Sequence, residues 1–444
     1  LENAGTFTSD ALVMTGGKFE NAGTATMLGA QSATTLAGTL ENAGTLKIEG
    51  THETVLNNGA MVHNTGTMTI APKLTIEGGE LHQSSDTTLA ATDVVVSDGL
   101  LRVDAEKTVK GESLTLSSTE KSHEAVLNDG LLDFADITVT QGALAGTGTL
   151  GTSDSTITVN ANGSVEQAKI EAQALQNQGS VTTNALNAAQ ATNAGAMTIT
   201  GTQSGTLANS GELKLEGAAV EGDVTNTGTL TGTGNVTLAG GKLTHSSDVE
   251  ATFETFTTDA GTLIVDEGKT MTGDAFVMNG GEAGINGTLA FADMTVNGGK
   301  LKGQGTIGSS ASKVTVNTDG TIEDIKHLEA NTLLNEGTIS AQNVTVTTGT
   351  NAGDLTIEGG LLKGDLTNTG TMTLDGATLA SGTLQNAGTL TGGQTVTIAG
   401  GKLHQSSDLA AQFNNLTITA GGLTVDEGKA VEGTGTLTVN GEGD

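Results

Sequence analysis

The chain contains no cysteine, tryptophan or tyrosine, one proline, and only eight phenylalanines among 444 residues. Without cysteine it can form neither disulfide bonds nor thiolate metal sites. Large aromatic side chains normally dominate globular cores, and a chain with 2% aromatic and 35% hydrophobic residues cannot build several such cores. It also lacks any apolar run of about 18 residues, so we predict no transmembrane helix and no insertion of this segment into a membrane.

Basic residues are scarce as well, because 18 Lys and Arg stand against 50 Asp and Glu, for a formal net charge of −32. Nucleic acids and anionic membrane surfaces would be repelled, so we expect neither as a partner. Charged residues nevertheless make up only 15% of the chain, and the apolar residues are regularly placed. We therefore predict a folded protein rather than a disordered one.

What the chain does contain is a short repeat of the form apolar, any, Asn, any, Gly, any, apolar. It occurs at residues 1–7 and again at residues 40–46. The asparagines that follow Asn177 come at steps of 16, 16 and 17 residues, and those that follow Asn335 at steps of 16, 17 and 18. A fixed period near 17 predicts a solenoid, in which one structural unit is repeated along the chain.

Asparagine and glycine tolerate the left-handed backbone that a sharp corner needs, so each repeat is expected to contain a turn. The predicted structural turn residues are Asn3, Gly5, Asn42, Gly44, Asn64, Gly66, Asn177, Gly179, Asn209, Gly211, Asn226, Gly228, Asn335, Gly337, Asn368, Gly370, Asn386 and Gly388.

Strict alternation of threonine and aliphatic residues follows many of these turns, as at residues 45–48 and 371–374. Alternation with period 2 is typical of a half-buried strand whose aliphatic side chains point inward. A unit of 17 residues cannot bury its apolar face alone, but stacked units can share one thin core. We predict an all-β parallel β-helix, or β-solenoid, of about 26 coils of roughly 17 residues, forming a single elongated rod.

A longer period lies on top of the short one. The segment Leu-Thr-His-Ser-Ser-Asp at 243–248 matches segments at 81–86 and 403–408, at offsets of 162 and 160 residues. We predict one continuous solenoid over residues 1–444, built from duplicated blocks of about 160 residues, or nine or ten coils, at approximately 1–174, 175–332 and, in part, 333–444. Since the number of blocks is not whole, we expect a segment of a longer parent chain or a subunit whose ends a neighbour covers.

Residues that suggest enzymatic chemistry have simpler explanations in this sequence. The segment Asn317-Thr-Asp-Gly320 resembles the first motif of polygalacturonases, but the paired Asp, the Gly-His-Gly and the Arg-x-Lys of that family do not follow it. We therefore predict a coil corner there. Arg102, the only arginine, is predicted to be an outward-facing strand residue rather than the base of a lyase.

The His-Ser-Ser-Asp segments could suggest a catalytic triad or a metal site. His82 and His404 occupy the second place of the motif, whereas His245 occupies the third. A one-residue shift in a strand turns a side chain to the opposite face, which a conserved ligand or base would not tolerate. We predict turns in which Ser and Asp bond to local backbone, and we assign no catalytic, cofactor-binding or metal-binding residue. The scattered carboxylates leave loosely bound Ca²⁺ possible.

The Asn-x-Gly corners, the Thr/aliphatic alternation, the duplicated blocks, the lack of cysteine and the acidic composition together resemble passenger domains of Gram-negative autotransporter adhesins. This resemblance covers essentially the whole chain. It implies a right-handed parallel β-helix displayed outside the cell, at the bacterial surface, which acts in adhesion, autoaggregation or biofilm formation.

Three functions are therefore open. The first is a non-enzymatic extracellular structural and adhesive rod or filament subunit that associates with itself, end to end or laterally, or with a cell-surface ligand. The second is a β-helix enzyme acting on polysaccharides, and the third is a module that binds a host or neighbouring protein.

Overall fold

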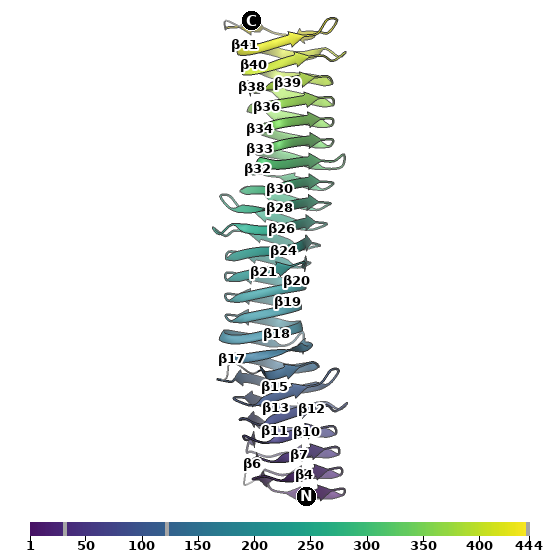
Figure 1. The fold of residues 1–444 in the computed structure, drawn as a ribbon, viewed down its shortest axis with the longest axis vertical. Coiled ribbons are helices and arrows are strands. Elements are labelled where there is room, and N and C mark those ends of the chain that lie inside the picture. The colour runs from purple at the N-terminus through teal and green to yellow at the C-terminus, as the bar shows by residue number, and fades with distance from the viewer. Residues whose placement is uncertain (30–32, 120–123, 441–444) are drawn as a thin grey trace. The chain divides into compact units, whose positions relative to one another are not determined.

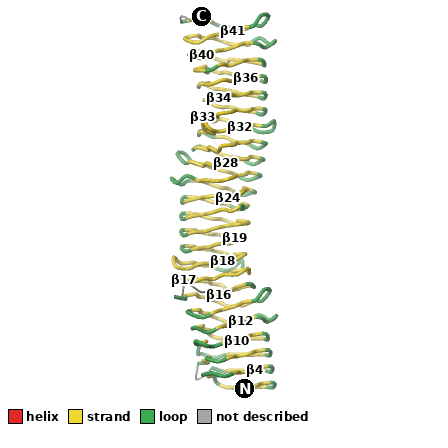
Figure 2. Tube along the Cα trace, viewed as in Figure 1, coloured by secondary structure: helices red, strands yellow, loops and turns green. Residues whose placement is uncertain are grey.

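The computed structural model describes residues 1–29, 33–119 and 124–440. Strands account for 72% of the chain, and the described residues contain no helix (Figure 2). The chain divides into two compact units, Leu1–Lys214 and Leu215–Asp444. Within each unit the strands of one coil pair in parallel with those of the next, as Figure 1 shows. The predicted all-β parallel β-solenoid is confirmed.

The strands of the first unit are β1 (Glu2–Asn3), β2 (Thr6–Ser9), β3 (Val13–Met14), β4 (Lys18–Asn21), β5 (Thr24–Met27), β6 (Thr34–Leu36), β7 (Thr39–Asn42), β8 (Thr45–Ile48), β9 (Thr54–Leu56), β10 (Met61–Asn64), β11 (Thr67–Ile76), β12 (Glu80–Gln83), β13 (Leu89–Val96), β14 (Leu100–Val103), β15 (Thr108–Ser117), β16 (Glu124–Asn128), β17 (Leu131–Leu150), β18 (Thr156–Asn177), β19 (Ser180–Asn193) and β20 (Ala196–Asn209).

The boundary between the units falls within β21 (Glu212–Glu216). The strands of the second unit are β22 (Ala219–Val220), β23 (Asp223–Asn226), β24 (Thr229–Leu238), β25 (Lys242–His245), β26 (Ala251–Thr258), β27 (Thr262–Val265), β28 (Thr270–Met278), β29 (Glu282–Ile285), β30 (Thr288–Val296), β31 (Lys300–Lys302), β32 (Thr306–Val316), β33 (Thr321–Asn335), β34 (Thr338–Asn351), β35 (Asp354–Glu358), β36 (Leu361–Asn368), β37 (Thr371–Asp375), β38 (Thr378–Ser381), β39 (Thr383–Asn386), β40 (Thr389–Gln405), β41 (Ala411–Val425), β42 (Val431–Gly433) and β43 (Leu437–Val439).

A coil consists of three short strand segments separated by turns. In the third coil these are β7, β8 and β9, and they pair with β10 and β11 of the next coil. Side chains alternate along each segment, so that Leu46 and Ile48 of β8 are buried, whereas Thr45 and Lys47 face outward. Inward aliphatic side chains of neighbouring coils therefore stack into one continuous core within each unit.

Coil length varies more than the sequence period predicts. Hydrogen-bonded amide side chains of successive coils are 18, 21, 22 and 19 residues apart between Asn3 and Gln83. After Asn177 and Asn335 the spacing falls to 16. The mean is about 19 residues over about 23 turns, rather than the predicted 17 and 26. The predicted period was too short because it came from the two tightest stretches, and longer coils place their extra residues in loops.

Four phenylalanines, Phe134, Phe253, Phe291 and Phe413, occupy places that a glycine of the preceding coil leaves open. A Cβ atom on Gly111 would lie 2.6 Å from the ring of Phe134, and one on Gly273 would lie 2.6 Å from the ring of Phe291. Both rings are at most 1% exposed. Close packing explains why these rings lie opposite glycines, whereas the buried Phe256 and Phe276 pair with Val236 and Phe256 of their preceding coils.

Candidate functional site

The predicted Asn corners lie at strand ends, and their side chains point into the core. Asn21 Nδ2 donates to Asn42 Oδ1 at 2.7 Å, and Asn42 Nδ2 donates to Asn64 Oδ1 at 2.7 Å. The same two Nδ2 atoms also donate to the backbone carbonyls of Thr45 and Thr67, at 2.9 and 3.0 Å. These three asparagines are at most 1% exposed, so the ladder pairs amides that would otherwise be buried without partners.

The other predicted asparagines belong to similar rows. The partly exposed Asn3 begins the first row, and Asn226 lies 3.1 Å from His245 Nδ1 in the second unit. The remaining hydrogen-bonded amide rows are Asn177, Asn193 and Asn209 in the first unit, and Asn335, Asn351, Asn368, Asn386 and Gln405 in the second. Asn21 was missed, although residues 19–25 carry the same Asn-x-Gly pattern.

The predicted reason for glycine at these corners was wrong. Gly44 and Gly370 do not have left-handed backbone, and the asparagines do not either. Instead, a Cβ on Gly44 would lie 2.1 Å from the carbonyl oxygen of Gly23 in the preceding coil, and one on Gly370 would lie 2.3 Å from that of Gly353. A similarly close approach to the preceding coil occurs at Gly66, Gly179, Gly211, Gly337 and Gly388. Close stacking of coils, rather than left-handed geometry, requires glycine here.

Residues that pair with one another from coil to coil form a row along the solenoid. Successive blocks do not place their amide side chains on the same row. In the first unit one row passes through Asn3, Asn21, Asn42, Asn64, Gln83, Val103, Asn128, Gly146 and Gln167, which is eight steps. Asn177 follows Val159 instead, so it lies on a different row, whose earlier members include the aliphatic residues Leu56 and Ile76. In the sequence, Asn177 comes before Thr183, which is the ninth step of the first row. A block therefore spans between eight and nine coils, fewer than the predicted nine or ten.

The second unit repeats this change of row. Asn226 and His245 lead to Val265, whereas Asn335 follows Val316 on a separate row. A block that spans a non-integer number of coils turns each new copy to a different side of the solenoid. Equivalent residues of successive blocks within one unit therefore face different directions.

Each block also carries a pair of loops on consecutive coils. Loop pair 1 comprises residues 84–88 and 104–107, loop pair 2 residues 246–250 and 266–269, and loop pair 3 residues 406–410 and 426–429. Within the second unit, loop pairs 2 and 3 project at opposite edges in Figure 1. In every pair, a lysine that ends the second loop forms an ion pair with an aspartate of the first. These ion pairs are Lys107–Asp86, Lys269–Asp248 and Lys429–Asp408.

The two partners of each ion pair differ in exposure. The lysine side chains are 20–24% exposed, whereas the aspartate side chains are 94–95% exposed. The hydrogen bond from lysine lowers the pKa of Asp86, Asp248 and Asp408 below the ordinary value of an aspartate. Each loop pair therefore presents an ionised carboxylate at its tip, held in place by a lysine that lies against the coil.

The second serine of each motif shapes the first loop, as predicted. The hydroxyl oxygens of Ser85, Ser247 and Ser407 accept hydrogen bonds from the backbone N–H two residues later, at 3.0, 3.0 and 3.1 Å. All three serines are buried. The prediction that serine bonds to local backbone is confirmed, whereas the prediction for the aspartates was wrong, because Asp86, Asp248 and Asp408 bond to a lysine of the next coil.

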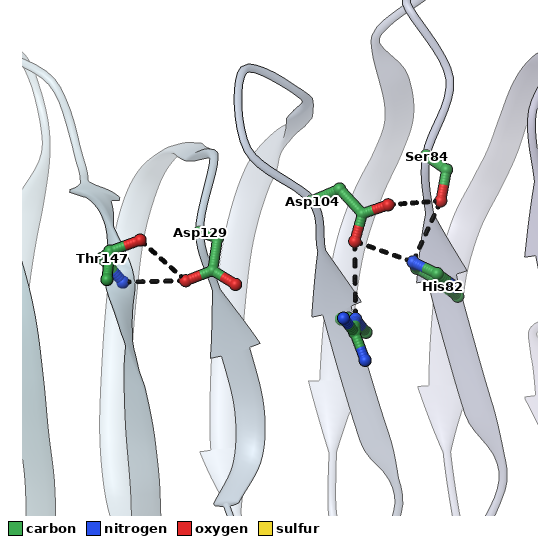
Figure 3. Close-up of polar contacts among 6 residues, drawn as sticks. His82, Ser84, Asp104, Asp129 and Thr147 are labelled. Atoms are coloured by element: carbon green, nitrogen blue, oxygen red, sulfur yellow. Dashed lines mark hydrogen bonds and ion pairs between the residues drawn. The ribbon is translucent and has the colours of Figure 1, made fainter.

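His82, Ser84 and Asp104 form a cluster at the base of loop pair 1 (Figure 3). His82 Nε2 lies 2.8 Å from Asp104 Oδ1 and 2.9 Å from Ser84 Oγ, and Ser84 Oγ donates to Asp104 Oδ2 at 2.7 Å. A Ser-His-Asp relay needs serine and aspartate on different ring nitrogens, but here both meet the same one. The cluster instead ties the two loops together, and the outward-facing Arg102 adds a bond to Asp104 at 3.4 Å.

In the other two loop pairs, different contacts link the first loop to the second. His404 Nε2 lies 2.8 Å from Asp426 Oδ1, whereas in loop pair 2 Ser246 Oγ donates to Asp266 Oδ2 at 2.5 Å. His245 itself is 0% exposed, so the prediction that its one-residue shift turns it to the opposite face is confirmed. Burial lowers its pKa, and the nearby carbonyls of Thr270 and Val249 offset this only in part.

The Asp–Lys ion pairs were not predicted, although the sequence contains the signal. In all three copies the lysine follows the aspartate by 21 residues, which is close to one coil length. Two residues one coil apart lie side by side in a solenoid. The Asn317–Gly320 segment is a turn closed by Gly320 N donating to Asn317 O at 2.8 Å, so the predicted coil corner is confirmed.

Within residues 1–29, 33–119 and 124–440, no three His, Asp or Glu side chains gather closely enough to hold a metal ion. No helix in those residues has the length and apolar character needed to cross a membrane. Comparisons with models of protein families, with curated proteins and with solved structures found no match.

Proposed function

We propose that this protein is an extracellular structural and adhesive scaffold of the bacterial surface, which displays loop pairs 1–3 for self-association or cell adhesion. The observation that carries the proposal is the repetition of one loop architecture with the same half-buried lysine and exposed aspartate. Repeated contacts on one chain raise overall avidity without any new kind of contact.

The loop tips have a further feature suited to protein contact. Val249 and Leu409 occupy equivalent positions beside the exposed aspartates of loop pairs 2 and 3, and they are 50% and 58% exposed. An apolar side chain next to a charge can contribute both burial and orientation to a contact. We propose a second copy of this chain or a cell-surface ligand as the partner, and no catalytic role or bound cofactor.

Self-association would be tested with a triple variant that neutralises the tips, Asp86→Asn, Asp248→Asn and Asp408→Asn. Its matched control is Asp136→Asn, Asp293→Asn and Asp354→Asn, because these three exposed strand aspartates lie outside the loop pairs and the change in net charge is the same. Beads coated with each protein would be scored for aggregation. We expect the tip variant to aggregate less and the control to aggregate at least as well as the parent chain. Equal behaviour of the two variants would exclude the loop tips as the contact.

Salt gives an independent measurement. A chain with a net charge of −32 repels its copies at low ionic strength, so we expect sedimentation to show stronger association as NaCl or a divalent cation is added. Weaker association at high salt would mean that ionic attraction drives the contact. The alternative, a polysaccharide-acting enzyme, predicts turnover in a screen of acidic and neutral glycans, and a calcium titration of the melting temperature would test loosely bound Ca²⁺.

A further inference from the structure

A polar groove in the second unit is lined by residues of β33, β34 and β35 and of the turn before β32. Figure 1 labels β32, β33 and β34 on the ribbon. The groove is a hollow of about 250 Å³, lined by the polar side chains of Gln304, Asp324, Lys326, Ser340, Gln342 and Glu358. None of these residues belongs to a loop pair or to an amide row. The groove is therefore independent of the function proposed above.

A backbone irregularity underlies the groove. Asp324 has a φ of 54°, and the register between β33 and β34 shifts between Ile322 and Ile325. Gln304 Nε2 donates to the carbonyl of Asp324 at 3.0 Å and so ties the bulge to the preceding coil. Residues other than glycine with positive φ are uncommon, and such strained positions gather at binding sites.

Five of the six polar side chains that line the groove form no hydrogen bond or ion pair within the described residues, unlike those just beside it. Lys300 and Lys302 form ion pairs across coils with Glu323 and Glu282, at 2.5 and 3.2 Å. By contrast, no hydrogen bond or ion pair within the described residues engages the side chains at the five groove positions 324, 326, 340, 342 and 358. The hydrogen bond to Glu323 and, to a smaller extent, the charge of Asp324 raise the pKa of the nearby Lys300, but the five side chains keep their hydrogen-bonding groups available to a ligand in the concave site.

The chemistry of these groups fits an uncharged sugar chain. A sugar hydroxyl can donate to the carboxylates of Asp324 and Glu358 and accept from the ammonium of Lys326 or the amide of Gln342. Two carboxylates against one ammonium leave the groove with one net negative charge, which disfavours uronates and phosphates. A peptide is less suited, because the groove has no aromatic anchor and the strands around it are already paired.

We propose that this groove binds a segment of an uncharged oligosaccharide through hydrogen bonds. The site is shallow and lacks an aromatic platform, so we expect dissociation constants of about 0.1–1 mM. The probes are cellohexaose, mannohexaose and N-acetylated chitohexaose, with hexagalacturonate as the charged comparison. Binding to the full chain would be measured by isothermal titration calorimetry.

The groove variant is Lys326→Met with Glu358→Gln, and its matched control is Lys313→Met with Glu336→Gln, which alters exposed residues of the same unit outside the groove. Circular dichroism would confirm that both variants fold. We expect at least one neutral hexasaccharide to bind, and the groove variant to weaken that binding by about ten-fold or more. The control should bind as the parent chain does.

Three results would overturn the proposal: no binding of any neutral probe at about 5 mM, preferential binding of hexagalacturonate, or equal binding by the groove and control variants. Bead aggregation depends on the loop tips, so a failure of that assay and a failure of sugar binding can be told apart.

Discussion

Loop pair 2 differs from loop pairs 1 and 3 by which residue its first strand turns inward. The strand before loop pair 2 ends in buried His245, whereas Gln83 and Gln405 take that place in the other copies and His82 and His404 face outward. Gln405 accepts a bond from Asn386 at 2.7 Å and donates to the carbonyl of Leu409 at 2.7 Å. His245 contacts Asn226, but its Nε2 atom is buried without a hydrogen bond.

This difference shows that one strand position decides whether the amide row ends in glutamine, which stays neutral at every pH, or in histidine, which titrates. Gln pairs its acceptor and its donor at every pH, whereas a buried imidazole can be protonated. Loop pair 2 is therefore the copy whose attachment to the core should depend on pH.

The largest effect on stability should come from replacing the residue that ends each amide row, which is Gln405 or His245. In Gln405→Leu, the amide of Asn386 loses one acceptor and the carbonyl of Leu409 loses its donor, so we expect a loss of about 2–3 kcal/mol in the free energy of unfolding. His245→Leu removes one contact and an orphaned nitrogen, and we expect a loss of about 1 kcal/mol or less. Urea denaturation of the two variants would measure the difference. Equal losses would mean that the two row ends are energetically alike.

The next effect concerns pH. The folded state lowers the pKa of His245, so the unfolded chain binds a proton more readily. Stability is then unaffected above the ordinary histidine pKa of about 6.5 and falls as the pH drops below it, by about 1.4 kcal/mol for each unit of pKa lowering.

We expect His245→Gln to remove this loss, because Gln occupies the place in both other copies. Melting temperature and hydrogen exchange at residues 240–250, compared at pH 7.5 and 5.0, would test it. A parent chain and variant with the same pH response would contradict the assignment.

The reverse substitution, Gln405→His, should make the attachment of loop pair 3 to the core depend on pH. We expect a modest loss of stability at pH 7.5, of about 1 kcal/mol, since one buried donor is lost, and a new loss below pH 6.5. Hydrogen exchange at residues 400–410 should then accelerate on acidification more than it does in the parent chain, while exchange at residues 180–190, which contain no titratable side chain, serves as the internal control. Unchanged exchange at low pH would show that the loop is not held through this row.

The smallest effect lies at the turn of the second loop. Glu106 has a φ of 64°, where loop pairs 2 and 3 have Gly268 and Gly428 at 72° and 78°. Glycine adopts this conformation without steric cost but loses more chain entropy on folding, so we expect Glu106→Gly to stabilise by only about 0.5 kcal/mol. Gly268→Glu should destabilise by a similar amount. Calorimetric melting of both variants would check the opposite signs.

Much of the fold could be predicted because its information is local. Alternation at period 2 set Leu46 and Ile48 inward and placed His245 and His82 on opposite faces, since neighbouring residues of a strand always point to opposite sides. The role of Gly44 could not be predicted in this way. Its contact is with Gly23 of the preceding coil, and residues that far apart are brought together only by stacking.

The same distinction between local contacts and contacts between coils applies to the candidate sites. Serine motifs such as Ser85 with Thr87 are local and were predicted, whereas the Lys107–Asp86 ion pair joins two coils. The groove at Asp324 was not foreseen, because it depends on a bulge and on residues from several coils.

By itself the sequence determined the strand pattern, the inward and outward faces, the repeated block and the acidic surface, all of which follow from composition and from short-range periodicity. Only the tertiary structure decided which side of a unit each copy faces. That direction depends on the summed length of every coil, loop and bulge between two copies, and a block spans between eight and nine coils. A fractional number of coils turns the same motif to a new row, and no local pattern records that sum.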